Sequence, residues 1–99
     1  MSVIGLVVTL KVQPGKESEF EAVFTKLRAE VKANEAGCLQ YDFFRSRQES
    51  GTYIITEQYA SAEALDLHSK THYFTAAQPA LGATLADAPT MLFLDKVVE

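Results

Sequence analysis

The sequence alternates between two kinds of hydrophobic pattern, and the order of these patterns is what most restricts the fold. Between residues 16 and 37, charged residues separate apolar side chains that recur every three or four positions, namely Phe20, Val23, Phe24, Leu27 and Val31. This spacing places the apolar side chains on one side of an α-helix. Gly37 stands where a glycine commonly ends a helix. We therefore predict an amphipathic helix over this stretch.

Four further stretches are rich in β-branched and aromatic residues and predict strands, which are 3–12, 38–46, 52–59 and 91–98. A short loop containing Gly51 joins the second of these strands to the third. Loops of this kind connect antiparallel neighbours. We expect the two strands to form a hairpin.

A second helix is expected to begin at Ser61 and to reach Phe74. The stretch that follows, 75–90, contains two prolines and Gly82, so we expect no more than one or two helical turns in it, packed as a flap. The resulting order, β-α-β-β-α-β, is that of the ferredoxin-like fold. We predict a single α+β domain over residues 1–99, with a four-stranded antiparallel sheet and both helices on one face.

The predicted strands are apolar on both faces. A sheet covered by helices on one side should alternate apolar and polar residues. Strand 91–98 instead has Met91 and Phe93 on one face and Leu92 and Leu94 on the other. A second apolar face needs a cover, and another copy of the same sheet can provide it. We expect a homodimer, with two sheets face to face in a dimeric α+β barrel.

Composition excludes several classes of partner. The formal net charge is −4 and no long basic cluster occurs, so we expect no nucleic-acid partner. The apolar run 3–10 is far shorter than the ~20 residues of a membrane helix, and the features of a signal peptide are missing. Cys38, the single cysteine, cannot form an internal disulfide. We expect a soluble, cytoplasmic protein that does not bind membranes.

The two histidines are the first candidates for chemistry. His68 and His72 are four residues apart in the predicted second helix, on the side that should face the sheet. They could lie at the edge of the core, or be half of a metal site with Glu57 as a third ligand. We prefer a third interpretation, in which one or both titrate near neutral pH in a pocket and move a proton. His68 lies farther from the helix end and is the favoured acceptor, with His72 as a second donor or a gate.

Glu57 is an unusual residue for its position in the predicted strand 52–59. It shares one face of this strand with Tyr53, Ile55 and Tyr59. If that face looks toward the second helix, Glu57 can accept a hydrogen bond from a histidine and raise its basicity. The alternative is a surface partner for a cation such as Arg45.

Several motifs spread over nearly the whole chain belong together: Gly37-Cys38-Leu39-Gln40-Tyr41, Glu57-Gln58-Tyr59, Glu63-Ala64-Leu65, and His68 followed by His72-Tyr73-Phe74. They resemble the antibiotic biosynthesis monooxygenase family, which includes quinol monooxygenases and forms dimeric α+β barrels. The resemblance implies an enzyme without a cofactor that oxidises a small quinol or polycyclic phenol with dioxygen. Residues in catalytic roles would be His68, His72 and Glu57, and those in contact with the small aromatic substrate would be Tyr59, Tyr41 and Phe74.

The chain departs from the family at one position. Members often carry a tryptophan where this chain has Tyr59, and haem-degrading relatives also use an asparagine of the first strand, which 3–12 lacks. Haem chemistry is therefore not expected, and no glycine-rich motif for a nucleotide cofactor occurs. Two other functions remain open, which are isomerisation of a small carbonyl compound and binding of a metabolite by a non-enzymatic dimeric stress-response protein.

Overall fold

The structure is a computed structural model in which residues 2–98 are described. Its elements are β1 (Ile4–Lys11), α1 (Glu17–Asn34), β2 (Cys38–Arg45), β3 (Thr52–Tyr59), α2 (Ala62–Lys70), α3 (His72–Thr84) and β4 (Thr90–Asp95). The predicted ferredoxin-like α+β fold is confirmed, except that the second helical region consists of two helices.

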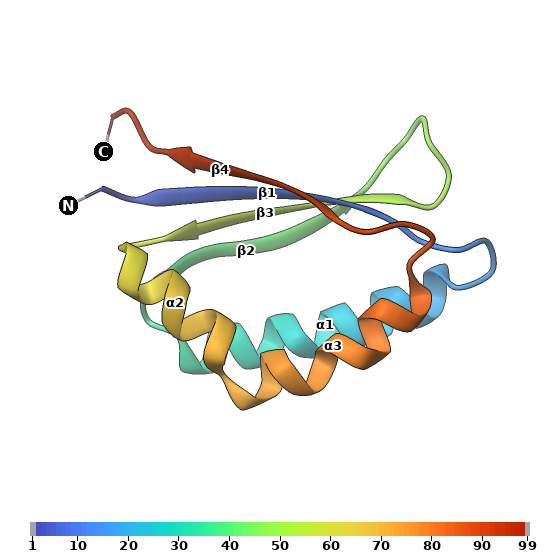
Figure 1. Ribbon diagram of the computed structural model, residues 1–99, viewed down its shortest axis with the longest axis horizontal. Coiled ribbons are helices and arrows are strands. Elements are labelled where there is room, and N and C mark those ends of the chain that lie inside the picture. Colours follow the sequence, from blue (N-terminus) through green and yellow to red (C-terminus); the bar gives the residue numbers. More distant parts are fainter. Residues whose placement is uncertain (1, 99) are drawn as a thin grey trace.

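The four strands form one sheet in the order β2-β3-β1-β4, and every neighbouring pair is antiparallel. All three helices lie on one side of this sheet, and the two ends of the chain lie close to each other at one end of it (Figure 1). Helix α1 packs against both β2 and α3. Within residues 2–98, no helix combines the length and the apolar character that crossing a membrane requires.

The core lies between the sheet and α1. The helix buries Phe20, Phe24, Leu27 and Val31, as its spacing predicts. Removing such side chains from water contributes about 1.5–3 kcal/mol each to folding. The ring of Phe24 stacks on that of Tyr41 in β2, with 5.3 Å between the ring centroids. This aromatic packing holds Tyr41 on the face of the sheet that the helices cover.

The prediction of one continuous helix from Ser61 to Phe74 is wrong. Helix α2 ends at Lys70, and Thr71 has an extended backbone with φ −66° and ψ 149°. The hydroxyl oxygen of Thr71 accepts a hydrogen bond from the backbone N–H of Phe74, at 3.3 Å, and so caps α3. Threonine is favoured at such caps over helix interiors because its hydroxyl competes for backbone groups. The chain therefore changes direction between the two histidines.

The prediction of only one or two helical turns in 75–90 is also wrong. Helix α3 continues to Thr84 although Pro79 lies inside it. Proline removes one backbone hydrogen bond and usually bends or ends a helix. Here the cost is offset by the burial of Leu81 and Thr84 and by residues of high helix propensity, which are Ala76, Ala77, Ala80 and Ala83.

Gly37 has a different role from the predicted one. Helix α1 already ends at Asn34, three residues earlier. A Cβ atom on Gly37 would lie 2.7 Å from the Cβ atom of Ala64 in α2, which is closer than real Cβ contacts allow. Glycine therefore permits α2 to approach the start of β2 closely. The contact places α2, which carries His68, against this end of the sheet.

Strand β4 pairs only with β1 and is exposed along its whole length. Met91 and Phe93, on the side of the helices, are 56% and 60% exposed. On the opposite side, Leu92 and Leu94 are 58% and 43% exposed. The strand therefore presents large apolar side chains to solvent on both of its faces.

Candidate functional site

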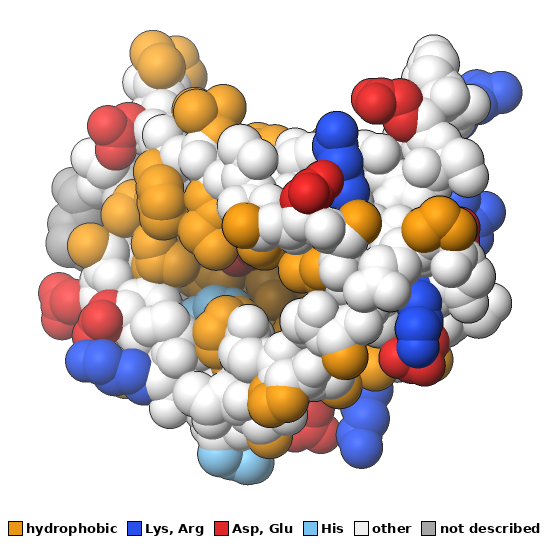
Figure 2. All heavy atoms as spheres, turned by 45° about the vertical axis from the view of Figure 1, so that its right-hand side comes forward, with side chains coloured by type: hydrophobic (Ala, Val, Ile, Leu, Met, Phe, Trp, Pro, Cys, Tyr) orange, Lys and Arg blue, Asp and Glu red, His pale blue; other side chains and the backbone are white. Residues whose placement is uncertain are grey.

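A cavity of about 480 Å³ lies between the sheet and helices α2 and α3. Figure 2 shows it as a hollow surrounded by hydrophobic side chains, with a histidine inside. The apolar wall includes Leu6, Val8, Ile55, Leu65, Phe74, Met91 and Phe93. Three polar side chains reach it from buried positions, which are Tyr41, Glu57 and His68. A mainly apolar cavity of this size with a few polar groups is typical of small-molecule sites.

His68 is buried in the wall of this cavity, with 3% of the residue exposed. Its Nδ1 atom lies 3.0 Å from Oε1 of Glu35. The rings of Tyr41, Tyr59 and Phe74 surround the imidazole at centroid distances of 5.1, 5.4 and 4.7 Å. Burial lowers the pKa of His68 below its ordinary value, and the carboxylate of Glu35 opposes this change. The imidazole is therefore mainly neutral at pH 7 and able to accept a proton.

Two polar atoms of the cavity wall have no hydrogen-bond partner within residues 2–98: the Oη atom of Tyr41 and the Nε2 atom of His68. In this part of the chain, every fully buried side-chain nitrogen or oxygen does have a partner. The two atoms are therefore at least partly accessible to solvent, and both residues line the cavity. Since unpaired polar atoms in an apolar surrounding are costly, these atoms are well placed to bind a polar group of a ligand.

Glu57 is the third polar group, and it lies in β3 between Tyr41 of β2 and Leu6 of β1. It is 6% exposed, and its Oε1 atom accepts a hydrogen bond from the hydroxyl of Tyr59 at 2.5 Å. Burial raises the pKa of Glu57 to about 7; the Tyr59 hydrogen bond acts against this rise, and the negative charge of Glu35 adds to it. Glu57 is therefore present in both protonation states near neutral pH.

The structure brings most of the predicted site residues together. Tyr41, Glu57, His68 and Phe74 line the same cavity. Tyr59 is fully buried and contacts the site through its hydrogen bond to Glu57. The expected hydrogen bond from a histidine to Glu57 does not occur, because Nδ1 of His68 faces a different carboxylate. The alternative expectation, a surface ion pair between Glu57 and Arg45, is not found within residues 2–98 either.

Arg45, which was that alternative partner, pairs with Glu21 at 2.7 Å. Glu21 also accepts the hydroxyl hydrogen of Tyr53. Arg45 and Glu21 lie at the opposite end of β3 from Glu57, since Arg45 is paired in register with Tyr53. The charge of Arg45 therefore has no part in the cavity.

The prediction that His72 shares an inward face with His68 is wrong. His72 is the first residue of α3, is exposed, and does not line the cavity. The break at Thr71 is the reason, because it ends the helical periodicity that the spacing of four residues assumes. The four-residue spacing of His68 and His72 therefore does not place two metal ligands next to each other. In the described part of the chain, no three His, Cys, Asp or Glu side chains are grouped so that they could hold a metal ion.

Glu35 and Tyr73 are parts of the site that were not predicted from the sequence. Glu35 follows directly after α1, and Tyr73 of α3 donates its hydroxyl hydrogen to Oε2 of Glu35 at 2.5 Å. One feature of the sequence could have indicated the role of Glu35. The negative end of a helix dipole disfavours a carboxylate, so an acidic residue just past a helix C-terminus indicates a partner elsewhere in the fold.

The comparison with protein families decides the identity of this domain. The model of the antibiotic biosynthesis monooxygenase family matches residues 3–80, which include Tyr41, Glu57, His68 and Phe74. The chain belongs to this family. Strand β4, which completes the sheet and one wall of the cavity, lies beyond the matched part.

Known relatives agree with membership in the antibiotic biosynthesis monooxygenase family. A solved structure from Caulobacter crescentus, described as a putative antibiotic biosynthesis monooxygenase, is 54% identical, covers 97% of this chain and 91% of its own, and has a TM-score of 0.95. The putative monooxygenase YcnE of Bacillus subtilis is 32% identical over 66% of this chain and 67% of its own length. An uncharacterized protein of Synechocystis is 34% identical over 66% of this chain. That match spans only 44% of the Synechocystis protein.

In this member of the family, Tyr59 occupies the position for which the resemblance implies a tryptophan. Tyr59 is fully buried, and its hydroxyl is engaged by Glu57. A tryptophan would offer an N–H donor from a different place on a larger ring. The tyrosine therefore links the buried carboxyl group to the aromatic packing around His68.

The raised pKa of Glu57 predicts how stability depends on pH in this family member. Folding raises this pKa from the ordinary value of 4.5 to about 7. Unfolding therefore releases a proton between these pH values, and the free energy of unfolding should fall as pH rises through this window and level off above it. The expected contribution is roughly 3 kcal/mol. Glu57→Gln, which can still accept the Tyr59 hydrogen bond, should lack this decrease.

Urea denaturation at pH 5 and pH 8 measures the difference. The wild type should lose more stability between the two pH values than Glu57→Gln does. Glu63→Gln is the matched control, because Glu63 is an exposed glutamate at the start of α2. Equal losses in wild type and Glu57→Gln would show that Glu57 ionises normally in the folded protein.

Proposed function

We propose that this protein is a cofactor-independent monooxygenase that oxidises a small quinol or polycyclic phenol with dioxygen. The main support is the pair of unpartnered polar atoms, Tyr41 Oη and His68 Nε2, in an otherwise apolar cavity. The imidazole can accept the proton of a substrate hydroxyl, and the phenol can donate a hydrogen bond to the resulting anion. Membership in the family and the description of its relatives as putative monooxygenases also support this proposal.

The proposed reaction begins with transfer of the substrate hydroxyl proton to His68. The phenolate then passes one electron to dioxygen, and recombination forms a bond between a ring carbon and oxygen. The peroxide takes up the proton from His68 and loses water, which leaves a carbonyl group. In the net reaction, one ring carbon of the substrate becomes a carbonyl carbon. In the keto tautomer of the phenol this carbon carries two hydrogens, and its CH₂ group and O₂ give C=O and H₂O. An apolar cavity suits these steps because it excludes water from the intermediates.

The cavity wall also indicates the charge of the substrate. Among the described residues of its lining there is no lysine or arginine, whereas Glu57 is buried in it and Asp66 lies exposed on α2. A carboxylate or phosphate on the substrate would find no cation to pair with and would be close to acidic groups. The aromatic rings of Tyr41 and Phe74 can pack against a flat ring system. The proposed substrate is therefore an uncharged aromatic molecule.

Dioxygen uptake by metal-stripped, flavin-free protein tests the proposal. With a panel of uncharged quinols and polycyclic phenols, we expect uptake well above that of buffer, one O₂ consumed per substrate, and one atom of ¹⁸O₂ in the product. Controls with catalase and superoxide dismutase separate this reaction from autoxidation. Uptake equal to that of buffer for all substrates would contradict the proposal. Substrates that bind but never react would favour the function of a metabolite-binding protein.

A second candidate function is isomerisation of a small carbonyl compound. It is favoured by the presence of two titratable groups on the cavity wall, Glu57 with a pKa of about 7 and His68 with a pKa below its ordinary value. One group can remove a proton from carbon while the other delivers a proton to another position. Such activity would persist without dioxygen, whereas the monooxygenase activity would stop.

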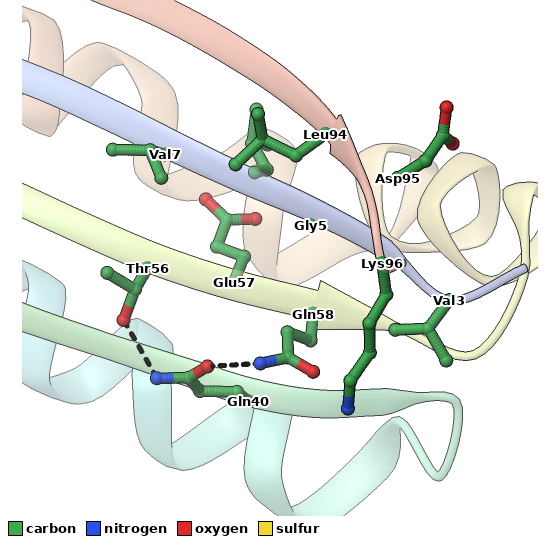
Figure 3. Close-up of a pocket in the computed structure, with 11 residues that line it drawn as sticks. Val3, Gly5, Val7, Gln40, Thr56, Glu57, Gln58, Leu94, Asp95 and Lys96 are labelled. Carbon is green, nitrogen blue, oxygen red and sulfur yellow. Dashed lines mark hydrogen bonds between the residues drawn. The ribbon is translucent and has the colours of Figure 1, made fainter. Parts of the chain in front are cut away.

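We also propose that the chain forms a homodimer through the sheet face opposite the helices. This face carries Leu92 and Leu94 together with Val7 from β1. Figure 3 shows part of it, where the amide of Gln40 donates to Thr56 and accepts from Gln58 across neighbouring strands. Large apolar side chains are rarely left exposed in such numbers on a monomer. A two-fold related copy would cover them and leave the helices outside.

A further inference from the structure

The carboxylate of Glu35 joins three helices on one side of His68. Glu35 is the residue directly after α1, and its side chain is only 10% exposed. Its two oxygens lie 3.0 and 3.2 Å from Nδ1 of His68 in α2. Tyr73 of α3 donates its hydroxyl hydrogen to Oε2 at 2.5 Å. Two partners from different helices therefore determine the orientation of this carboxylate.

The contact also determines which nitrogen of His68 carries a proton. An ionised carboxylate can only accept hydrogen bonds, so Nδ1 has to be an N–H donor. In the neutral imidazole, Nε2 is then the nitrogen with a free lone pair. Nε2 is also the atom that has no partner among residues 2–98 and remains open to the cavity. The free lone pair is thus available where a ligand would bind.

We propose that Glu35, held by Tyr73, is a positioning residue that keeps His68 in the tautomer protonated at Nδ1 and leaves Nε2 ready to accept the substrate proton. The catalytic use of this tautomer rests on the proposed function, whereas the tautomer itself does not. Glu57 cannot take this role in the described structure, because it is held by Tyr59 and shares no hydrogen bond with His68.

The tautomer can be measured without any substrate by ¹⁵N NMR of the imidazole rings. At about pH 8, His68 of the wild-type protein should show a protonated Nδ1 and an unprotonated Nε2. His72, which is exposed, is an internal reference in the same spectrum. The other titratable groups near the ring, Glu57 and the phenols of Tyr41 and Tyr59, are unchanged in the variants below. A wild-type His68 protonated at Nε2 would overturn the proposal.

Glu35→Gln removes the charge and keeps the size of the side chain. The pKa of His68 should fall further, because Glu35 is the charge that raises it, and the single tautomer should be lost. We expect kcat to fall by ~10–100-fold with little change in KM, which is the range found when hydrogen-bond partners that orient metal-binding histidines are removed. Tyr73→Phe keeps the carboxylate but removes its second partner, so it should cause a smaller loss.

The matched control is Glu63→Gln, which removes an exposed charge from α2 and should leave the tautomer, the titration and kcat unchanged. An unchanged tautomer and titration in Glu35→Gln would overturn the proposal. If Glu35→Gln does not fold, the wild-type spectrum still decides the tautomer. A protein that consumes no dioxygen would contradict the proposed function, and the NMR result would still confirm or overturn the tautomer.

Discussion

Replacing His68 by alanine should lower the rate of substrate oxidation by ~10²–10⁴, the range expected when a general base is removed. The imidazole is buried in the cavity wall, and its Nε2 atom is the one basic nitrogen in the described lining that has no partner. His68→Gln should show a similar loss. Glutamine fills much of the same volume, so this variant separates the loss of the base from the effect of an empty space. Initial rates of dioxygen uptake measure both changes.

His72→Ala is the matched control for this experiment. His72 is exposed on α3 and does not line the cavity, so the variant should retain nearly full activity. Circular dichroism should show that all three variants are folded. If His68→Ala and His68→Gln were as active as the wild type, His68 would be a residue of the core and not a base.

The pH dependence gives a second measurement on His68. A base must be unprotonated, so the rate should rise with pH through the pKa of His68, which burial holds below the ordinary value of 6.5. The rising part of the profile should therefore lie on the acidic side of neutrality. Ionisation of Glu57, with a pKa of about 7, should add a second change that Glu57→Gln removes.

Leu94→Glu should convert the proposed dimer to monomers or prevent folding. Leu94 lies on the sheet face opposite the helices, opposite Gly5 of β1 in register, and is 43% exposed in the single chain. In a dimer with the two sheets face to face, the new carboxylate would be buried without a partner. An unpaired buried charge costs several kcal/mol, which is enough to dissociate many interfaces. Leu92→Glu should have the same effect.

Sedimentation at micromolar concentration measures this change. Leu67→Glu is the matched control, because Leu67 is a 66% exposed leucine of α2, on the helical side of the molecule. This variant should sediment as the wild type does. A wild-type protein that is a stable monomer under these conditions would contradict the proposed dimer.

The fold could be predicted because hydrophobic periodicity reports on local geometry. The spacing of Phe20, Phe24 and Leu27 specified which face of α1 is buried, and the shared face of Tyr53 and Glu57 is buried as well. The break at Thr71 could not be seen in this way. Its cause is a single side-chain cap, and the periodicity on either side of it remains compatible with one long helix.

The site could be predicted only in part, because much of it depends on contacts between residues distant in sequence. Tyr41, Glu57, His68 and Phe74 were identified from residue type and face. The partner of His68 was not, because Glu35 is 33 residues away and reaches it only after α1 and α2 have each packed against β2. Sequence periodicity contains no information about which of two carboxylates, Glu35 or Glu57, will meet the imidazole.

The contact between Gly37 and Ala64 has a consequence for how this scaffold can acquire new specificities. The backbone of Gly37 and the methyl group of Ala64 limit how closely α2 approaches the sheet, because neither group can change its rotamer. The side chains that determine the width of the cavity, such as Leu65, Phe74 and Met91, belong to other positions. Substitutions at Leu65 and Met91 can therefore reshape the cavity for a different ring system while His68, which packs against Phe74, stays in place.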